Sequence, residues 1–266
     1  GPILDFADDP HHAADYGGGV YMQGDGSKLS RSTIADNDSG FRGGGVYLKS
    51  EPNAIADSTI SGNEADQDGG GVFVSSGAVT ARRSTIAAND AGSDGGGVFL
   101  YDSSHGDEVP LKLSSAIVAD NTSYEETTAD LATSDDVTIS SAFSLVEGET
   151  DGIDFDSEVP ATNILGVDPQ LGPLADNGGP TLTQLPAPTS PAIDAGVAGG
   201  ETTDQRGEDR PVDSAALALL LSWTRAAMKA LPWSRALMPG STVASVNPPR
   251  RSATPGNSSA NCRACS

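Results

Sequence analysis

The sequence predicts an all-β protein built as a parallel β-helix, a solenoid whose coils are about 26 residues long. Three observations carry this prediction. Stretches of three glycines followed by a Val-aromatic pair begin at Gly17, Gly43, Gly69 and Gly95, so they recur every 26 residues. A second motif, STI with an asparagine three residues later, recurs in the same register. Apolar and polar residues also alternate within each unit, as they do in half-buried strands.

The repeat places equivalent residues of successive coils directly above one another, about 4.8 Å apart. Val20 and Met22 share one face of a strand, and Tyr21 lies on the other. A unit of this length cannot bury its own apolar face, so stacked units must supply the core. We therefore expect two inner columns and one asparagine stack at a turn: Val20, Val46, Val72 and Val98; Ile34, Ile60, Ile86 and Val118; Asn37, Asn63, Asn89 and Asn121.

Two other repeat architectures fit less well. A β-propeller blade needs about 40 residues or more, and a leucine-rich repeat needs a leucine ladder that this sequence lacks. Three consecutive glycines are costly to order, because glycine loses the most backbone freedom on folding. The repeated triplet therefore indicates a tight corner of each coil rather than a ligand-binding loop.

The fourth unit is longer than the others. Asn121 follows Asn89 by 32 residues, so this unit carries about six extra residues, which we expect to protrude as a loop within 101–113. Insertions on one face of a solenoid often carry binding. His105, Asp107 and Glu108 lie in this insertion and are our candidate ligand contacts, with a plain loop as the alternative.

Composition and charge exclude several classes of function. The 266 residues carry a formal charge of −22, which argues against a nucleic-acid-binding protein because such binding depends on neutralising phosphates. The start of the sequence shows no signal peptide, and no apolar run approaches the 20 or so residues of a transmembrane helix. Phosphate-loop and dinucleotide motifs are also lacking, so no cofactor is expected.

The remaining charged residues leave several interpretations open. Most acidic residues stand in turns, where Asp shapes the backbone; adventitious Ca²⁺ binding and catalysis are the alternatives. His11 and His12 lie near four acidic residues, as an exposed loop or a metal site. Arg31, Asp57 and Arg83 are spaced by 26 residues and would alternate in sign along one column. We interpret this column as surface charge pairing that contributes little, with a ligand-facing groove as the alternative.

The repeats resemble bacterial right-handed β-helix proteins of the pectin-lyase-like superfamily. The stretches DPQLGPLADNGGPTLTQLPAPTSPAIDAG at 168–196 and TTDQRGEDRP at 202–211 resemble a choice-of-anchor Q region. This resemblance implies an extracellular or cell-surface module that acts as a structural or adhesin-like scaffold, with glycans or cell-surface components as partners. The alternative that it implies is a carbohydrate-active enzyme, a polysaccharide lyase or hydrolase.

These observations divide the chain into three parts: β-helix coils over 1–150, a choice-of-anchor Q-like region over 151–213, and a basic tail over 214–266. All 37 acidic residues precede position 214, whereas the tail has six basic residues and the only two cysteines, Cys262 and Cys265. The resemblance leads us to expect a short acidic strand where this tail stands. We interpret the tail as irregular and foreign to the fold, such as a frameshift product, with an amphipathic membrane-surface helix as the alternative.

Overall fold

The structure is a computed structural model that describes residues 14–24, 26–49, 53–101, 111–124, 129–134, 138–148, 154–156 and 162–210. The chain divides into two compact units, Gly1–Leu219 and Leu220–Ser266, and every described residue belongs to the first. The predicted tail over 214–266 and the two histidines at positions 11 and 12 lie outside the described residues. Within the described part, no helix is long and apolar enough to cross a membrane.

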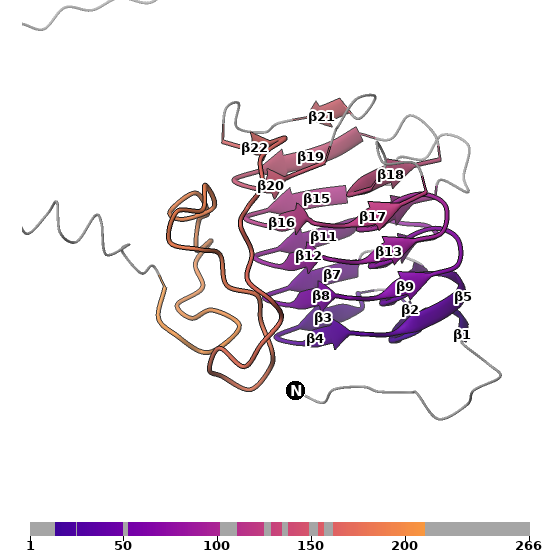
Figure 1. Cartoon of the computed structure of the whole chain (residues 1–266), viewed down its shortest axis with the longest axis horizontal. Helices are drawn as coiled ribbons and strands as arrows, with labels where there is room; N and C mark the ends of the chain where they lie inside the picture. Colours follow the sequence, from indigo (N-terminus) through magenta and orange to yellow (C-terminus); the bar gives the residue numbers. More distant parts are fainter. Residues whose placement is uncertain are drawn as a thin grey trace, which may run out of the picture. The chain divides into compact units, whose positions relative to one another are not determined.

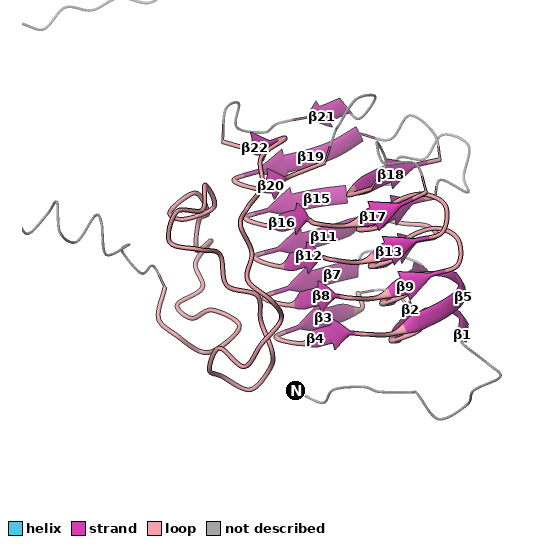
Figure 2. Ribbon diagram, in the orientation of Figure 1, coloured by secondary structure: helices cyan, strands magenta, loops and turns pink. Residues whose placement is uncertain are grey.

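Short parallel strands form four sheets whose strands stack along one axis, as Figure 1 and Figure 2 show. Each coil passes through the sheets in the order B, C, D, A. Sheet A contains β1 (Ala14–Tyr16), β5 (Asp38–Arg42), β9 (Glu64–Ala65), β13 (Asp90–Ala91) and β17 (Thr122–Ser123). Sheet B contains β2 (Val20–Gln23), β6 (Val46–Lys49), β10 (Val72–Val74), β14 (Val98–Leu100) and β18 (Leu131–Thr133). Sheet C contains β3 (Lys28–Ser30), β7 (Asn53–Ala56), β11 (Val79–Arg82), β15 (Leu111–Ser114), β19 (Thr138–Ala142) and β21 (Asp154–Asp156). Sheet D contains β4 (Thr33–Ala35), β8 (Thr59–Ser61), β12 (Thr85–Ala87), β16 (Ile117–Ala119), β20 (Leu145–Val146) and β22 (Ile164–Leu165).

The strand register confirms the parallel β-helix and both predicted inner columns. Val72 pairs with Val46 on one side and Val98 on the other, and Ile86 lies between Ile60 and Val118. The valines and isoleucines of the middle coils are buried in one core cluster that runs along the axis. Because each coil repeats the same inward residues, the core of one coil continues into the next without a break.

Two glycines of each triplet are required for different reasons. Gly43, the first of its triplet, has a φ of 72°, a left-handed conformation that glycine adopts most readily. Gly44, the second, has no room for a side chain, because a Cβ atom there would collide with the backbone oxygen of Glu64 on β9. This geometry confirms that the triplet is an architectural corner. The stacked backbones leave space for glycine alone.

The aromatic residues of sheet B form a ladder on the outer face of the sheet. The rings of Tyr21 and Tyr47 stack with centroids 5.1 Å apart, those of Tyr47 and Phe73 at 5.2 Å, and those of Phe73 and Phe99 at 5.5 Å. The Arg42 guanidinium lies 5.0 Å from the centre of the Phe73 ring. This cation–π contact covers the ladder and helps to keep Phe73 buried on a face that would otherwise be solvated.

The predicted asparagine stack is a hydrogen-bonded ladder inside one turn. Asn37 Nδ2 donates to Asn63 Oδ1 at 2.8 Å, Asn63 Nδ2 to Asn89 Oδ1 at 2.9 Å, and Asn89 Nδ2 to Asn121 Oδ1 at 2.9 Å. The last acceptor is Asp130 Oδ1, 2.8 Å from Asn121 Nδ2. Asp130 stands one residue before Leu131, which pairs with Val98, so it takes the place of the third glycine of the triplet. Its carboxylate thereby ends the ladder.

The insertion of the fourth unit adds the predicted six residues to the register, but it ends earlier in the sequence than expected. We expected a protruding loop within 101–113, but Leu111–Ser114 is strand β15, and Leu111 and Leu113 are buried in the core. Their alternation with polar residues is the strand pattern that the loop prediction overlooked. Pairing in sheets C and D also continues to β21 and β22, so the coils extend to Leu165, past the predicted boundary at 150.

Candidate functional site

The three candidate contacts of the insertion, His105, Asp107 and Glu108, lie outside the described residues, between β14 and β15. The chain returns to sheet C directly after the insertion, and Lys112 is the second residue of β15. The described residues that bear on function are therefore those around sheets C and D and the segment that covers them.

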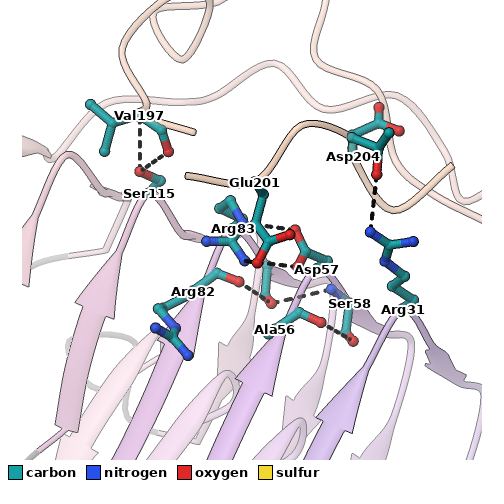
Figure 3. Close-up of polar contacts among 12 residues, drawn as sticks. Arg31, Ala56, Asp57, Ser58, Arg82, Arg83, Ser115, Val197, Glu201 and Asp204 are labelled. Carbon is teal, nitrogen blue, oxygen red and sulfur yellow. Dashed lines mark hydrogen bonds and ion pairs between the residues drawn. The ribbon is translucent and has the colours of Figure 1, made fainter. Parts of the chain in front are cut away.

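The column of Arg31, Asp57 and Arg83 lies at the corner between sheets C and D. All three residues have a φ near 50°, a left-handed conformation that is uncommon for residues with side chains. Arg83 Nε and one NH2 group donate to the two carboxylate oxygens of Asp57, both at 2.8 Å. The predicted alternation of charge is thus confirmed for this pair, which Figure 3 shows. Arg31 is held differently, by a hydrogen bond from its NH2 group to Thr203 Oγ1.

The prediction that this pairing is a weak surface contact was wrong. The side chains of Arg83 and Asp57 are each 7% exposed, because the C-terminal segment, residues 166–210, lies over them. Glu201 of this segment adds a second carboxylate 3.7 Å from Arg83. The hydrogen bonds with Asp57 raise the pKa of Arg83 although burial opposes this. A buried bidentate pair is costly to break, since one charge would remain without its partner.

The C-terminal segment is held against the outer face of sheet D by side chains of the repeated STI motif. Thr33 Oγ1 donates to the backbone oxygen of Leu182 at 2.6 Å, and Thr59 Oγ1 donates to Gln205 Oε1 at 2.9 Å. Gln205 is itself buried and donates to Thr181 Oγ1. Figure 1 shows this segment running beside β4, β8, β12 and β16. Within the predicted region over 151–213, residues 166–210 therefore wrap the coils, whereas β21 and β22 add to them.

A cationic groove of about 540 Å³ lies on the outer face of sheet C. Four basic side chains line it: Lys28 of β3, Arg82 of β11, Arg83 of the corner and Lys112 of β15. None of the described residues that line it is acidic, and Val197 and Gly199 of the C-terminal segment form one edge. In the part of the chain that the structure describes, the side chains of Lys28 and Arg82 have no ion-pair partner. Figure 3 shows the Arg82 side chain pointing away from Asp57.

The sequence offered a ligand-facing groove only as the alternative for the column that contains Arg83. Lys28, Arg82 and Lys112 were not anticipated as its lining, although a signal for the two lysines existed. Lys28, Thr80 and Lys112 belong to one column, because β3 and β11 both pair with β7, and β11 pairs with β15. The step from Thr80 to Lys112 is the same 32-residue step that separates Asn89 from Asn121. Extending the register through the insertion would have brought the two lysines to one face.

A cavity of about 380 Å³ at the other end of the described coils is lined by the carboxylates of Asp120, Asp130 and Glu147. Burial raises the pKa of all three, although the hydrogen bond from Asn121 opposes the rise at Asp130. Glu147 Oε2 accepts a hydrogen bond from the backbone nitrogen of Asp120 at 2.9 Å. Among the described residues, no group of three or more His, Cys, Asp or Glu side chains is placed to hold a metal ion.

The stacked coils and their side-chain ladders define a right-handed parallel β-helix repeat protein. The family model described as "Right handed beta helix region" matches residues 11–143, half of the chain, and the chain belongs to this family. Searches of curated proteins and of solved structures found no match. The family establishes the architecture, and a β-helix is consistent with both scaffold and carbohydrate-related roles.

Proposed function

We propose that this chain is a non-enzymatic β-helix scaffold, extracellular or at the cell surface, that binds acidic glycans in the groove of sheet C. The observation that carries the proposal is the gathering of Lys28, Arg82, Arg83 and Lys112 around one groove, with no acidic side chain among the described residues of its lining. Only nine basic residues precede position 214, against 37 acidic ones. Four of these nine share one site, so the groove differs in charge from the rest of residues 1–213.

The charges of the groove suit an extended polyanion better than a compact ligand. Lys28 and Lys112 lie on β3 and β15, three coil steps apart, which is about 14 Å at the usual strand spacing. A ligand that follows the axis would meet one cation after another, while the acidic remainder of residues 1–213 would repel it elsewhere. Arg83 is already bound to Asp57, so we expect Lys28 and Arg82 to supply most of the attraction, with Lys112 adding to it.

The test is glycan binding by the full chain, measured by isothermal titration calorimetry with polygalacturonate and alginate, and with dextran as the neutral control. We expect binding of the acidic polymers to weaken as salt is raised, because exposed charges are screened. Replacing Lys28, Arg82 and Lys112 together by Gln is expected to weaken binding about ten-fold or more. Lys49→Gln, which removes an exposed charge on sheet B, is the matched control.

Three outcomes would contradict the proposal. The groove is not the site if the triple variant binds acidic polymers as tightly as the Lys49→Gln control. Release of reducing ends or unsaturated products from either polymer would overturn the non-enzymatic part. Detection of the protein only in the cytosol of its producing cells, by fractionation and immunoblotting, would refute the extracellular or surface location.

A hydrolase is the second candidate function, and the cavity of Asp120, Asp130 and Glu147 is the observation that favours it. Glycoside hydrolysis uses a carboxyl group of raised pKa as a general acid beside an ionised carboxylate. The two carboxylate oxygens of Asp130 already accept hydrogen bonds from Asn121 Nδ2 and the backbone nitrogen of Gly148. Asp120 and Glu147 would therefore be the reacting pair. This candidate requires turnover of a glycan by the wild type that Glu147→Gln abolishes. Turnover that persists in that variant would refute it.

A further inference from the structure

A second pocket lies between sheet D and the C-terminal segment, and it shares Arg83 but no other described lining residue with the groove of sheet C. Its volume of about 460 Å³ falls within the usual range for sites of small molecules. Thr59 and Thr85 form its floor on sheet D, while Gln184, Ile193 and Arg210 belong to the covering segment. We call this site the seam pocket.

Two of the three arginines that line the seam pocket are already paired. Arg83 is bound by Asp57, and Arg206 is bound by Asp204 with nitrogen–oxygen distances of 2.9 and 2.8 Å. Arg210 is different: within the described part of the chain, its guanidinium makes no hydrogen bond or ion pair. Burial lowers the pKa of Arg210, although the nearby carboxylates of Asp57 and Asp204 oppose this. The pocket therefore presents one guanidinium that has no direct hydrogen-bond or ion-pair partner among the described residues.

A second polar group of the pocket also lacks a partner. Gln184 Oε1 is buried and accepts no hydrogen bond from the described residues. A buried acceptor without a donor costs free energy, as does an unpaired desolvated charge. Arg210 needs an oxyanion and Gln184 Oε1 needs a hydrogen-bond donor, so one ligand that carries both groups would satisfy the two residues at once. Leu185, Pro186 and Ile193 supply apolar surface for its carbon skeleton.

We propose that the seam pocket binds a small hydroxy-carboxylate, with its carboxylate on the Arg210 guanidinium and a hydroxyl group donating to Gln184 Oε1. Arg presents two parallel N–H groups that match a carboxylate. Sulfate matches the charge but has no proton to give Gln184 at neutral pH, and a neutral polyol offers the donor without the charge. Because the pocket joins sheet D to the C-terminal segment, bound ligand also stabilises the docking of that segment.

The experiment is calorimetric titration of the full chain with gluconate. Sorbitol is its uncharged counterpart, and hexanoate is its counterpart without hydroxyl groups. We expect gluconate to bind at least ten-fold more tightly than either, and Arg210→Gln to reduce its affinity at least ten-fold. Gln184→Met is expected to remove the preference for gluconate over hexanoate. Lys28→Gln, in the groove of sheet C, is the matched control and is expected to leave gluconate binding unchanged.

Hydrogen exchange of the C-terminal segment tests whether a variant weakens binding only because the segment has become less tightly packed on sheet D. Thr183 and Ala175 exchange backbone hydrogen bonds of 3.0 Å, and we expect gluconate to slow hydrogen exchange of both amides in the wild type and in Lys28→Gln. Equal binding of gluconate, sorbitol and hexanoate would overturn the proposal, as would full affinity in Arg210→Gln. Loss of gluconate binding in Lys28→Gln would place the ligand in the groove instead. The proposal for the seam pocket and the proposal for the groove of sheet C can therefore be refuted independently.

Discussion

The asparagine ladder makes Asn89 the most informative single position for testing how the coils are held together. Asn89 is buried, and its side chain takes part in four hydrogen bonds. Nδ2 donates to Asn121 Oδ1 at 2.9 Å and to the backbone oxygen of Ile60 at 3.1 Å. Oδ1 accepts from the backbone nitrogen of Asn63 at 3.0 Å and from its Nδ2 at 2.9 Å. Asn89→Ala removes all four bonds without changing the backbone.

The expected cost follows from the partners that the substitution leaves behind. Each hydrogen bond contributes about 1 kcal/mol net, and a buried group left unsatisfied costs about 1 to 3 kcal/mol. The backbone nitrogen of Asn63 and the backbone oxygen of Ile60 lose their side-chain partner. We therefore expect Asn89→Ala to lower the free energy of unfolding by about 3 to 5 kcal/mol.

Asn37 provides the matched control, because it stands at the first position of the ladder and is only partly buried. Its Nδ2 donates to Asn63 Oδ1 and to the backbone oxygen of Ala35, so Asn37→Ala removes two bonds. We expect a loss of about 1 to 2 kcal/mol. Urea unfolding followed by far-ultraviolet circular dichroism measures both variants. Equal losses at the two positions, or a loss below about 1 kcal/mol at Asn89, would refute the reasoning.

Three further predictions concern the corner, the carboxylates and the buried ion pair. Gly70→Ala should lower the free energy of unfolding by at least about 2 kcal/mol, because its Cβ would collide with the backbone oxygen of Asp90. Glu147→Gln should raise the melting temperature near neutral pH but not at acidic pH. The raised pKa of Glu147 means that the folded state loses stability as pH rises through the interval between the unfolded and folded pKa. Asp57→Asn and Arg83→Met should each cost about 3 kcal/mol in urea unfolding, and the double variant less than their sum.

Each of these predictions has a control and a contrary result. Gly196→Ala should change the free energy of unfolding by less than about 0.5 kcal/mol, because the nearest atom to its Cβ lies at 3.5 Å. If Gly70→Ala costs no more than Gly196→Ala, the collision with the backbone oxygen of Asp90 is ruled out. A melting-temperature gain for Glu147→Gln that is the same at every pH would remove protonation as its cause. Strict additivity of Asp57→Asn and Arg83→Met would mean that the two charges do not interact.

The 26-residue register accounts for most of the coiled part. It correctly placed Val72 between Val46 and Val98, and it placed the asparagines in one stack. The register fails where the repeat changes. Asp130 occupies a glycine position without resembling glycine, and its role at the end of the ladder depends on the backbone nitrogen of Gly148, 2.6 Å away. That contact joins two coils whose sequences do not match.

The candidate sites were predicted less completely than the fold. The column of Arg31, Asp57 and Arg83 was found by spacing, but its burial was not, because burial depends on a segment with no repeat. The common face of Lys28, Arg82 and Lys112 can be recognised only when the six inserted residues are included in the register. The insertion residues proposed as contacts, His105, Asp107 and Glu108, remain a prediction.

The sequence by itself determined the coil, its core and its ladders, because a solenoid places each residue against the same residue of the next coil. The spacing of two residues along the chain therefore predicts whether they lie side by side in neighbouring coils. Only the tertiary structure decided how the C-terminal segment covers sheet D. Thr33 contacts Leu182 and Gln205 across 149 and 172 residues, and no periodicity connects such distant positions. The buried ion pair and the seam pocket follow from that docking, because both form between elements that share no repeat.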